Sequence, residues 1–439
     1  MKRSMLVLAA LVFSAALAIL AFSAGAVAVE PGADDSAYLK LKEDAERFFE
    51  EGSYARALEL YRAAKEMSLP PTEARWVEFR LADAAWRSEL ATQKADSSEL
   101  EKQIAALEKL MQTLARTLEH TEERDRVWAE AAESLADASW ITPRRRNWGA
   151  AWPRYEQALD WWAGSSEVAA ARERYLRIIQ KAARPPGREP YYYYGYYGNQ
   201  LPVPVIENAL RIAVRDDDKA FLNYLLAMTL RYQGGDGFAA ARAIQAFETS
   251  IAIGKTEWYD DALFNFAEWM STQGRPEYLE DGTYRTRPDF KEALRLYRRI
   301  LSEFQKGETR HYDNARARAE QITRAEVSVA VSEFYEPGAI PEYHAGWRNV
   351  PRVDFSVYPI GLTKDVDLSG DSKTVGSWLA SLQLAGREAV LQWSKETGDR
   401  GDYQPGSINE RLTEKLPPGA YVIEARGEGQ RARDIILVT

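Results

Sequence analysis

The hydrophobic pattern of this chain changes its period once, near Arg324, and that change limits the fold more than any other feature. From about residue 37 to residue 321, apolar residues recur three and four positions apart, the spacing of amphipathic helices. Beyond Arg324 they alternate with polar residues, as half-buried strands require. The sequence therefore predicts an α + β multidomain protein, helical over residues 36–324 and strand-rich over residues 325–439.

The first helical stretch, residues 45–67, has the pattern of two helices joined by a tight turn. Small residues let such helices approach closely, and aromatic residues fill the groove between them. Seven positions carry this pattern: Ala45, Phe48, Gly52, Tyr54, Ala57, Tyr61 and Ala64. They resemble a tetratricopeptide repeat, with the closing proline displaced to residues 70–71.

Looser copies of the pattern return around Trp148, Phe238 and Phe290, giving about four or five degenerate repeats. The last copy contains an unusually long loop, residues 271–287. The resemblance implies an α-helical solenoid whose concave surface binds peptides or partner proteins.

Between the first two copies, apolar residues alternate spacings of four and three, which is a heptad seam. They are Leu100, Ile104, Leu107, Met111, Leu114 and Leu118. One interpretation is a coiled-coil contact with a second chain. The other is a long helix packed inside the solenoid, which the small number of heptads favours.

A tyrosine-rich insert, residues 184–204, interrupts the helical pattern, because its first part is rich in proline. Tyrosine offers a large contact area and a polar end, so it suits recognition surfaces. The candidate partner-binding residues are Tyr191, Tyr192, Tyr193, Tyr194, Tyr196 and Tyr197. The alternative is a loop that lies over the solenoid and covers apolar surface.

The strand-rich region begins at residues 325–331 and continues in the stretch GWRNVPRVDFSVYPIGL, residues 346–362, which reads as one extended strand. Further strands are expected near residues 388–394, 420–425 and 434–438. Six or seven short strands in this length predict a small antiparallel β-sandwich.

Two parts of this region carry a second resemblance. EPGAIPEYHAGWRNVPRVDFSVYPIGL and LPPGAYVIEARGEGQRARDIILVT look like the opening and the closing hairpin of the first macroglobulin domain of bacterial α2-macroglobulin-like proteins. The chain has no cysteine, so the thioester of that family is impossible, and it leaves no room for a bait region. The resemblance implies a protein or peptide partner in the cell envelope, either a chain with further macroglobulin domains or a protease.

The first 28 residues resemble a secretory signal peptide. Lys2 and Arg3 precede an apolar run, and small residues in the A-x-A pattern follow it. We therefore expect a periplasmic or extracellular protein, which contacts a membrane only if this segment stays uncleaved as an anchor.

The remaining residues show little sign of chemistry. The net charge of −9 argues against nucleic-acid binding. His120, His311 and His344 lie far apart and match no metal or catalytic motif. Asp365, Asp367 and Asp371 have calcium-loop spacing, but Gly376 stands where a bidentate glutamate is needed, and an acidic turn is the preferred interpretation. The acidic stretch RDDDK, residues 215–219, is similarly interpreted as the solvated start of a helix.

These observations predict an exported, non-enzymatic protein that binds or scaffolds other proteins, with no catalytic residue, cofactor or metal. The first alternative is a component of a macroglobulin-type protease-defence system. The second is an enzyme acting on envelope polymers, for which no acid–base pair is visible.

Overall fold

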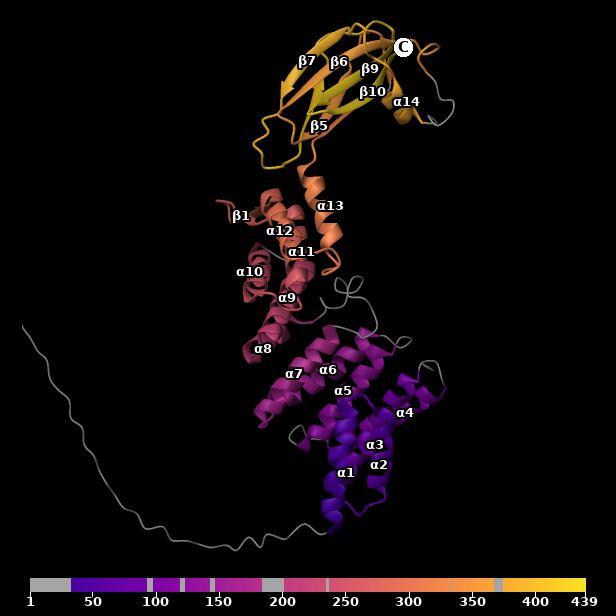
Figure 1. Cartoon of the computed structure of the whole chain (residues 1–439), viewed down its shortest axis with the longest axis vertical. Helices are drawn as coiled ribbons and strands as arrows, with labels where there is room; N and C mark the ends of the chain where they lie inside the picture. The colour runs from indigo at the N-terminus through magenta and orange to yellow at the C-terminus, as the bar shows by residue number, and fades with distance from the viewer. Residues whose placement is uncertain are drawn as a thin grey trace, which may run out of the picture. The chain divides into compact units, whose positions relative to one another are not determined.

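The computed structural model describes residues 33–92, 98–118, 123–142, 147–183, 201–233, 237–332, 334–366 and 374–439. Within these ranges the chain is helical up to Thr323, apart from one short hairpin, and mostly strand beyond it (Figure 1). The predicted order, a helical region followed by sheets, is confirmed. The predicted signal peptide lies outside the described residues.

The chain divides into two compact units, Met1–Leu135 and Ala136–Thr439. The first unit contains helices α1 (Ala33–Glu50), α2 (Tyr54–Lys65), α3 (Pro71–Ala91), α4 (Ser98–Thr117) and most of α5 (Arg126–Ile141). In the described residues, no helix is both long enough and apolar enough to cross a bilayer.

The expected first helix pair is α1 and α2. Gly52 lies between them at φ +77°, a left-handed conformation that glycine adopts without a steric penalty. Ala45, Ala57 and Tyr61 are buried together where the two helices meet. The small residues thus allow the close approach that the sequence pattern predicted.

The heptad seam lies on α4, which packs on α3. Its apolar side chains are buried within the first unit: Leu100, Ile104, Leu107, Leu110, Met111 and Leu114. This burial supports the interpretation of a packed helix over that of an exposed dimer seam.

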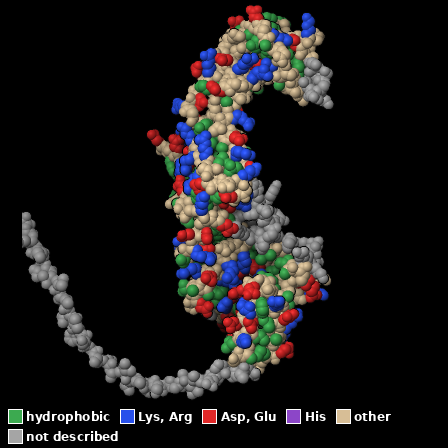
Figure 2. All heavy atoms as spheres, in the orientation of Figure 1, with side chains coloured by type: hydrophobic (Ala, Val, Ile, Leu, Met, Phe, Trp, Pro, Cys, Tyr) green, Lys and Arg blue, Asp and Glu red, His purple; other side chains and the backbone are tan. Residues whose placement is uncertain are grey.

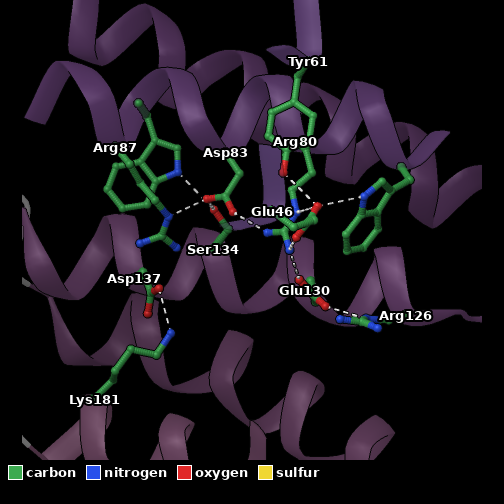
Figure 3. A network of polar contacts seen from close by, with 12 residues as sticks. Glu46, Tyr61, Arg80, Asp83, Arg87, Arg126, Glu130, Ser134, Asp137 and Lys181 are labelled. Atoms are coloured by element: carbon green, nitrogen blue, oxygen red, sulfur yellow. Dashed lines mark hydrogen bonds and ion pairs between the residues drawn. The ribbon is translucent and has the colours of Figure 1, made fainter. Parts of the chain in front are cut away.

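A buried ionic network connects α1, α3 and α5 in the first unit, and Figure 3 shows Arg80 at its centre. The Arg80 guanidinium lies 2.7 Å from Glu46, 3.2 Å from Glu130 and 3.4 Å from Asp83. Asp83 also accepts a hydrogen bond of 2.6 Å from Ser134 on α5. A buried charge is tolerated only when paired in this way, so the network fixes how the three helices face one another.

The second unit contains the remaining helices. They are the end of α5, then α6 (Trp148–Ala163), α7 (Val168–Ala183), α8 (Val203–Ile212), α9 (Asp216–Gln233), α10 (Gly237–Ile253), α11 (Tyr259–Thr272), α12 (Phe290–Glu303) and α13 (Tyr312–Thr323). Asn147 and Asp289 cap the first turns of α6 and α12 with their side chains. From α6 onward, each helix packs against its neighbour in chain order.

Two details of this helical part differ from the sequence-based expectation. The long loop at residues 271–287 contains an antiparallel hairpin of β1 (Pro276–Tyr278) and β2 (Tyr284–Thr286). The start of α9, expected to be solvated, contains the buried Asp218, whose carboxylate accepts hydrogen bonds from Arg215 and Gln180. An aspartate can be buried there because two donors replace water.

Two sheets complete the second unit. One has the strand order β4 (Phe334–Tyr335), β10 (Gln430–Val438), β9 (Gly419–Gly427), β6 (Arg352–Ile360) and β7 (Leu391–Glu396); the other has the order β3 (Glu326–Val331), β5 (Glu342–Arg348) and β8 (Gly406–Arg411). Inward side chains of both sheets share one apolar core, as the strand periodicity requires. The short helix α14 (Val375–Ser381) covers a second apolar cluster, formed with Val422 of β9.

The sheets correct two predictions. Residues 346–362 are not one strand: they contain the end of β5 and all of β6, which belong to different sheets. The chain breaks at Asn349, which has φ +54°. In addition, the sheets are not wholly antiparallel, because β4 pairs parallel to β10.

Asn349 also joins the sheets to α13. Its side-chain amide donates to the carbonyl oxygens of Ile322, at 2.7 Å, and Arg324, at 2.8 Å, at the end of α13. A second link runs from the Gln404 side chain to the Pro288 carbonyl oxygen, at 2.6 Å. The two bonds from Asn349 satisfy carbonyls that the end of α13 otherwise leaves unpaired.

Candidate functional site

The most promising site in the described residues is a groove formed by α7 and the segment from α8 to the first turn of α9. It consists of two cavities of about 340 and 300 Å³, which share Arg172 as a lining residue. The lining residues of α7 fall within residues 168–180, a length of about 18 Å at the helical rise. That length matches about five residues of extended chain.

Spacing along α7 explains how its side chains reach the groove. Val168, Arg172 and Tyr175 lie four and three positions apart, so they share one helix face and line one cavity. Arg172, Leu176 and Gln180 repeat the spacing of four and line the other. Arg172 belongs to both sets and therefore stands where the two cavities meet.

Arg172 carries a polar atom that its surroundings leave unsatisfied. Its Nε atom is buried and has no hydrogen-bond partner among the described residues. Buried polar atoms in folded proteins are nearly always paired, so an exception calls for a functional explanation. An anion bound in the groove would supply the missing acceptor.

The other charges of the groove are mostly positive. Arg177, Arg211 and Arg215 line it together with Arg172, against the two carboxylates of Glu173 and Asp218. The Asp218 carboxylate is occupied by Arg215, at 2.8 Å. The groove therefore carries a local positive excess on a chain of net charge −9.

Apolar surface accompanies these charges. Val168 is 63 % exposed in one cavity and Val214 is 62 % exposed in the other. Tyr175 and Trp162 form part of the inner wall. Burial raises the pKa of Tyr175, so its hydroxyl remains protonated and available as a donor at neutral pH.

The charged surface as a whole has a different character. In the face drawn in Figure 2, basic and acidic side chains of the described residues are interspersed. The groove is set apart by its concave shape and by the unsatisfied Arg172, rather than by a broad field of one sign.

The candidate residues from the sequence fall elsewhere. All six tyrosines, Tyr191, Tyr192, Tyr193, Tyr194, Tyr196 and Tyr197, lie outside the described residues. Of the expected insert, residues 184–204, the structure describes residues 201–204: Leu201 is fully buried and α8 begins at Val203. The contribution of the tyrosines to binding stays a prediction.

The structure describes two of the three histidines, and Nδ1 of one of them, His344, lies 2.8 Å from the side-chain oxygen of Asn409. His120 lies outside the described residues. The ring of His311 is buried, stacks on Phe264 and has Nε2 2.9 Å from Asp261. Burial alone would raise the pKa of Asp261, but His311 and Arg310 hold it below its ordinary value. This arrangement is a buried cluster of charged and hydrogen-bonded groups within the second unit.

No group of three or more His, Cys, Asp or Glu side chains suited to a metal occurs within the part of the chain that the structure describes. Asp365, considered for calcium, accepts two hydrogen bonds from Arg387 and one from the Gly361 amide. Asp367 and Asp371 lie outside the described residues, and Gly376 lies in α14.

The arginines that line the groove were not among the site residues predicted from the sequence. The recurrence of Arg172 and Gln180 at helical spacing was available as a signal, but a charged helix face usually indicates solvent exposure. That α8 pairs with α7 across the tyrosine-rich insert was not visible in the sequence. Comparisons with models of known protein families and with curated protein sequences find no match for this chain.

Proposed function

We propose that this chain is a non-enzymatic binding protein of the cell envelope that holds an extended, anionic polypeptide in the groove between α7 and α8. The unsatisfied buried Nε of Arg172, at the junction of the two cavities, is the observation that carries the proposal. A carboxylate is the ligand group that a guanidinium binds best, with two parallel hydrogen bonds.

The arrangement of charge and apolar surface favours a polypeptide over a free ion. The groove is long enough for several extended residues, and exposed valines lie in both cavities. Side chains of an extended peptide alternate between two faces, so acidic and apolar residues in alternation would meet both features. The −9 net charge of the chain would repel such a ligand at long range, so the groove must act locally.

The architecture supports the same proposal. α1 and α2 pack through small residues, and each helix from α6 onward packs against its neighbour, as a tetratricopeptide-type solenoid would require. Location in the envelope follows from the signal-peptide pattern of the first 28 residues. The resemblance of residues 325–439 to a macroglobulin domain makes a chain with further such domains, or a protease, the partner to test first.

Fluorescence polarisation with a labelled peptide of alternating Glu and Leu, about seven residues long, tests the proposal. Arg172→Glu should weaken binding about 10- to 100-fold, because a hydrogen bond to a charged group contributes about 1.5–3 kcal/mol. Arg298→Glu is the matched control, since Arg298 is an exposed arginine on α12. The proposal fails if a Lys–Leu peptide binds equally well, or if the two variants behave alike.

A further inference from the structure

A second concave site lies where the β1–β2 hairpin packs on the first turn of α10. The hairpin approaches the helix so closely that a Cβ added at Gly237 would lie 2.9 Å from Tyr284 and 3.1 Å from Tyr278. Gly237 is the first residue of α10, so these two rings pack directly on the helix backbone. From the sequence, residues 271–287 were expected to form only a long loop.

Aromatic side chains surround this contact and remain exposed. Phe238 is 64 % exposed, Tyr278 is 59 % exposed and Tyr232 is 49 % exposed. The rings of Tyr278 and Tyr284 lie 6.5 Å apart at an angle of 51°. Large aromatic residues gathered at one exposed place are uncommon on a monomer and indicate a binding surface.

A cavity of about 310 Å³ opens between the hairpin and the ends of α9 and α11. Tyr232 and Tyr284 form part of its wall, and Trp269 closes it from α11. This volume is at the small end of ligand pockets, so it would take one or two residues of a chain rather than a folded surface.

The polar lining of this cavity consists of groups that can donate hydrogen bonds. Arg231 and Gln273 contribute guanidinium and amide N–H groups, and Thr286 and the tyrosines contribute hydroxyls. None of the described residues that line it is an aspartate or a glutamate. The described lining therefore offers no carboxylate acceptor for the hydroxyl donors of a sugar.

We propose that this site, here called the hairpin pocket, binds a proline-rich segment of a partner protein in the polyproline II conformation. Proline has no backbone N–H, so such a segment presents carbonyl acceptors to the donors of the pocket. Its flat rings pack on tyrosine rings, and its conformation is already ordered before binding. The site is separate from the α7–α8 groove and shares no lining residue with it.

The test uses the full chain and a labelled decaproline peptide, with a glycine–serine peptide of equal length as the comparison. Decaproline should bind measurably more tightly. Tyr278→Ala and Tyr232→Ala should each weaken it about 5- to 10-fold, as expected for an exposed aromatic contact. Phe334→Ala, at a 68 % exposed position on β4, is the matched control and should change nothing.

Gln273→Glu provides a variant that preserves side-chain volume. Gln273 is exposed at the end of α11, so the change should leave the fold intact while replacing donors by acceptors. Gln273→Glu should weaken the binding of decaproline at least as much as Tyr278→Ala does. Arg172→Glu, in the α7–α8 groove, should leave the affinity for decaproline unchanged.

Three outcomes would overturn the proposal. The first is equal binding of decaproline and the glycine–serine peptide, and the second is tighter binding of a chitin or maltose oligosaccharide. The third is sedimentation showing that Tyr278→Ala dissociates a dimer while decaproline does not bind, because the pocket would then hold a second copy of the chain.

Discussion

Replacing Arg80 by methionine would remove the central cation of the ionic network in the first unit. The Arg80 side chain is almost completely buried, and it contacts carboxylates from three helices. Burial by itself would lower the pKa of Arg80, but Glu130, Glu46 and Asp83 raise it, so the guanidinium is always charged. Methionine keeps most of the apolar stem, so the change mainly removes charge and hydrogen bonds.

The loss of stability expected for Arg80→Met follows from the carboxylates that it leaves without their central cation. Three carboxylates would be left near one another. Glu130 and Asp83 are closed off from water, at about 1–2 % exposure, whereas the Glu46 side chain is 24 % exposed. Removing one partner of a buried ion pair typically destabilises by about 3–5 kcal/mol. Asp83 keeps Arg87 and Ser134, and Glu130 keeps Arg126, so we expect the loss to lie within that range rather than above it.

Hydrogen exchange measured by mass spectrometry on peptides from α3 would report this loss in the first unit alone. The matched control is Arg126→Met. Arg126 contacts the same Glu130 at 2.7 Å, but half of its side chain is exposed, so the cost should stay below about 1 kcal/mol.

A loss of stability in Arg80→Met equal to that in Arg126→Met would refute this account of the network.

Two further predictions concern the sheets. Asp365 is held at a pKa of about 2 by the Arg387 guanidinium and a backbone N–H. The stability that ionised Asp365 contributes should be present above about pH 4 and be lost as the pH falls through about 2. In the Arg387→Gln variant, a carbon NMR titration should show the pKa of Asp365 returning toward about 3.9. Where the sheets meet α13, Asn349→Ala loses two hydrogen bonds and places alanine at φ +54°, so it should lower the stability by about 2–4 kcal/mol. Asn349→Gly loses only the hydrogen bonds and should lower the stability by about 1–2 kcal/mol. Hydrogen exchange in the last turn of α13 measures this difference, and equal effects of the two variants would contradict the role given to the backbone angle.

Local signals predicted much of this fold. Gly52, Ala57 and Tyr61 identified the first helix pair, because a turn glycine and small residues at helical spacing act within one short segment. The change to period two near Arg324 located the sheets for the same reason. Apolar and polar residues continue to alternate across the break at Asn349, so β5 and β6 were predicted as one strand.

Features that depend on distant partners were not predicted. Asp218 looked solvated because its donor Gln180 lies 38 residues earlier in the chain. The groove was missed because Arg172 faces a helix that follows a tyrosine-rich insert. The β1–β2 hairpin has strands of three residues, too short for a period-two signal, and it depends on Gly237 of α10 for its packing.

The bond from Asn349 to Ile322 spans 27 residues, and this has a consequence for biosynthesis. Chains emerge in order at about 5–20 residues per second, so α13 is complete for one to several seconds before its terminal carbonyls can find their donor. During that interval the last turn frays and the helical part has an open end. Once the strands on either side of Asn349 have paired, its side chain caps the end of α13. The last turn of the helical part is therefore completed by a residue that is not in a helix.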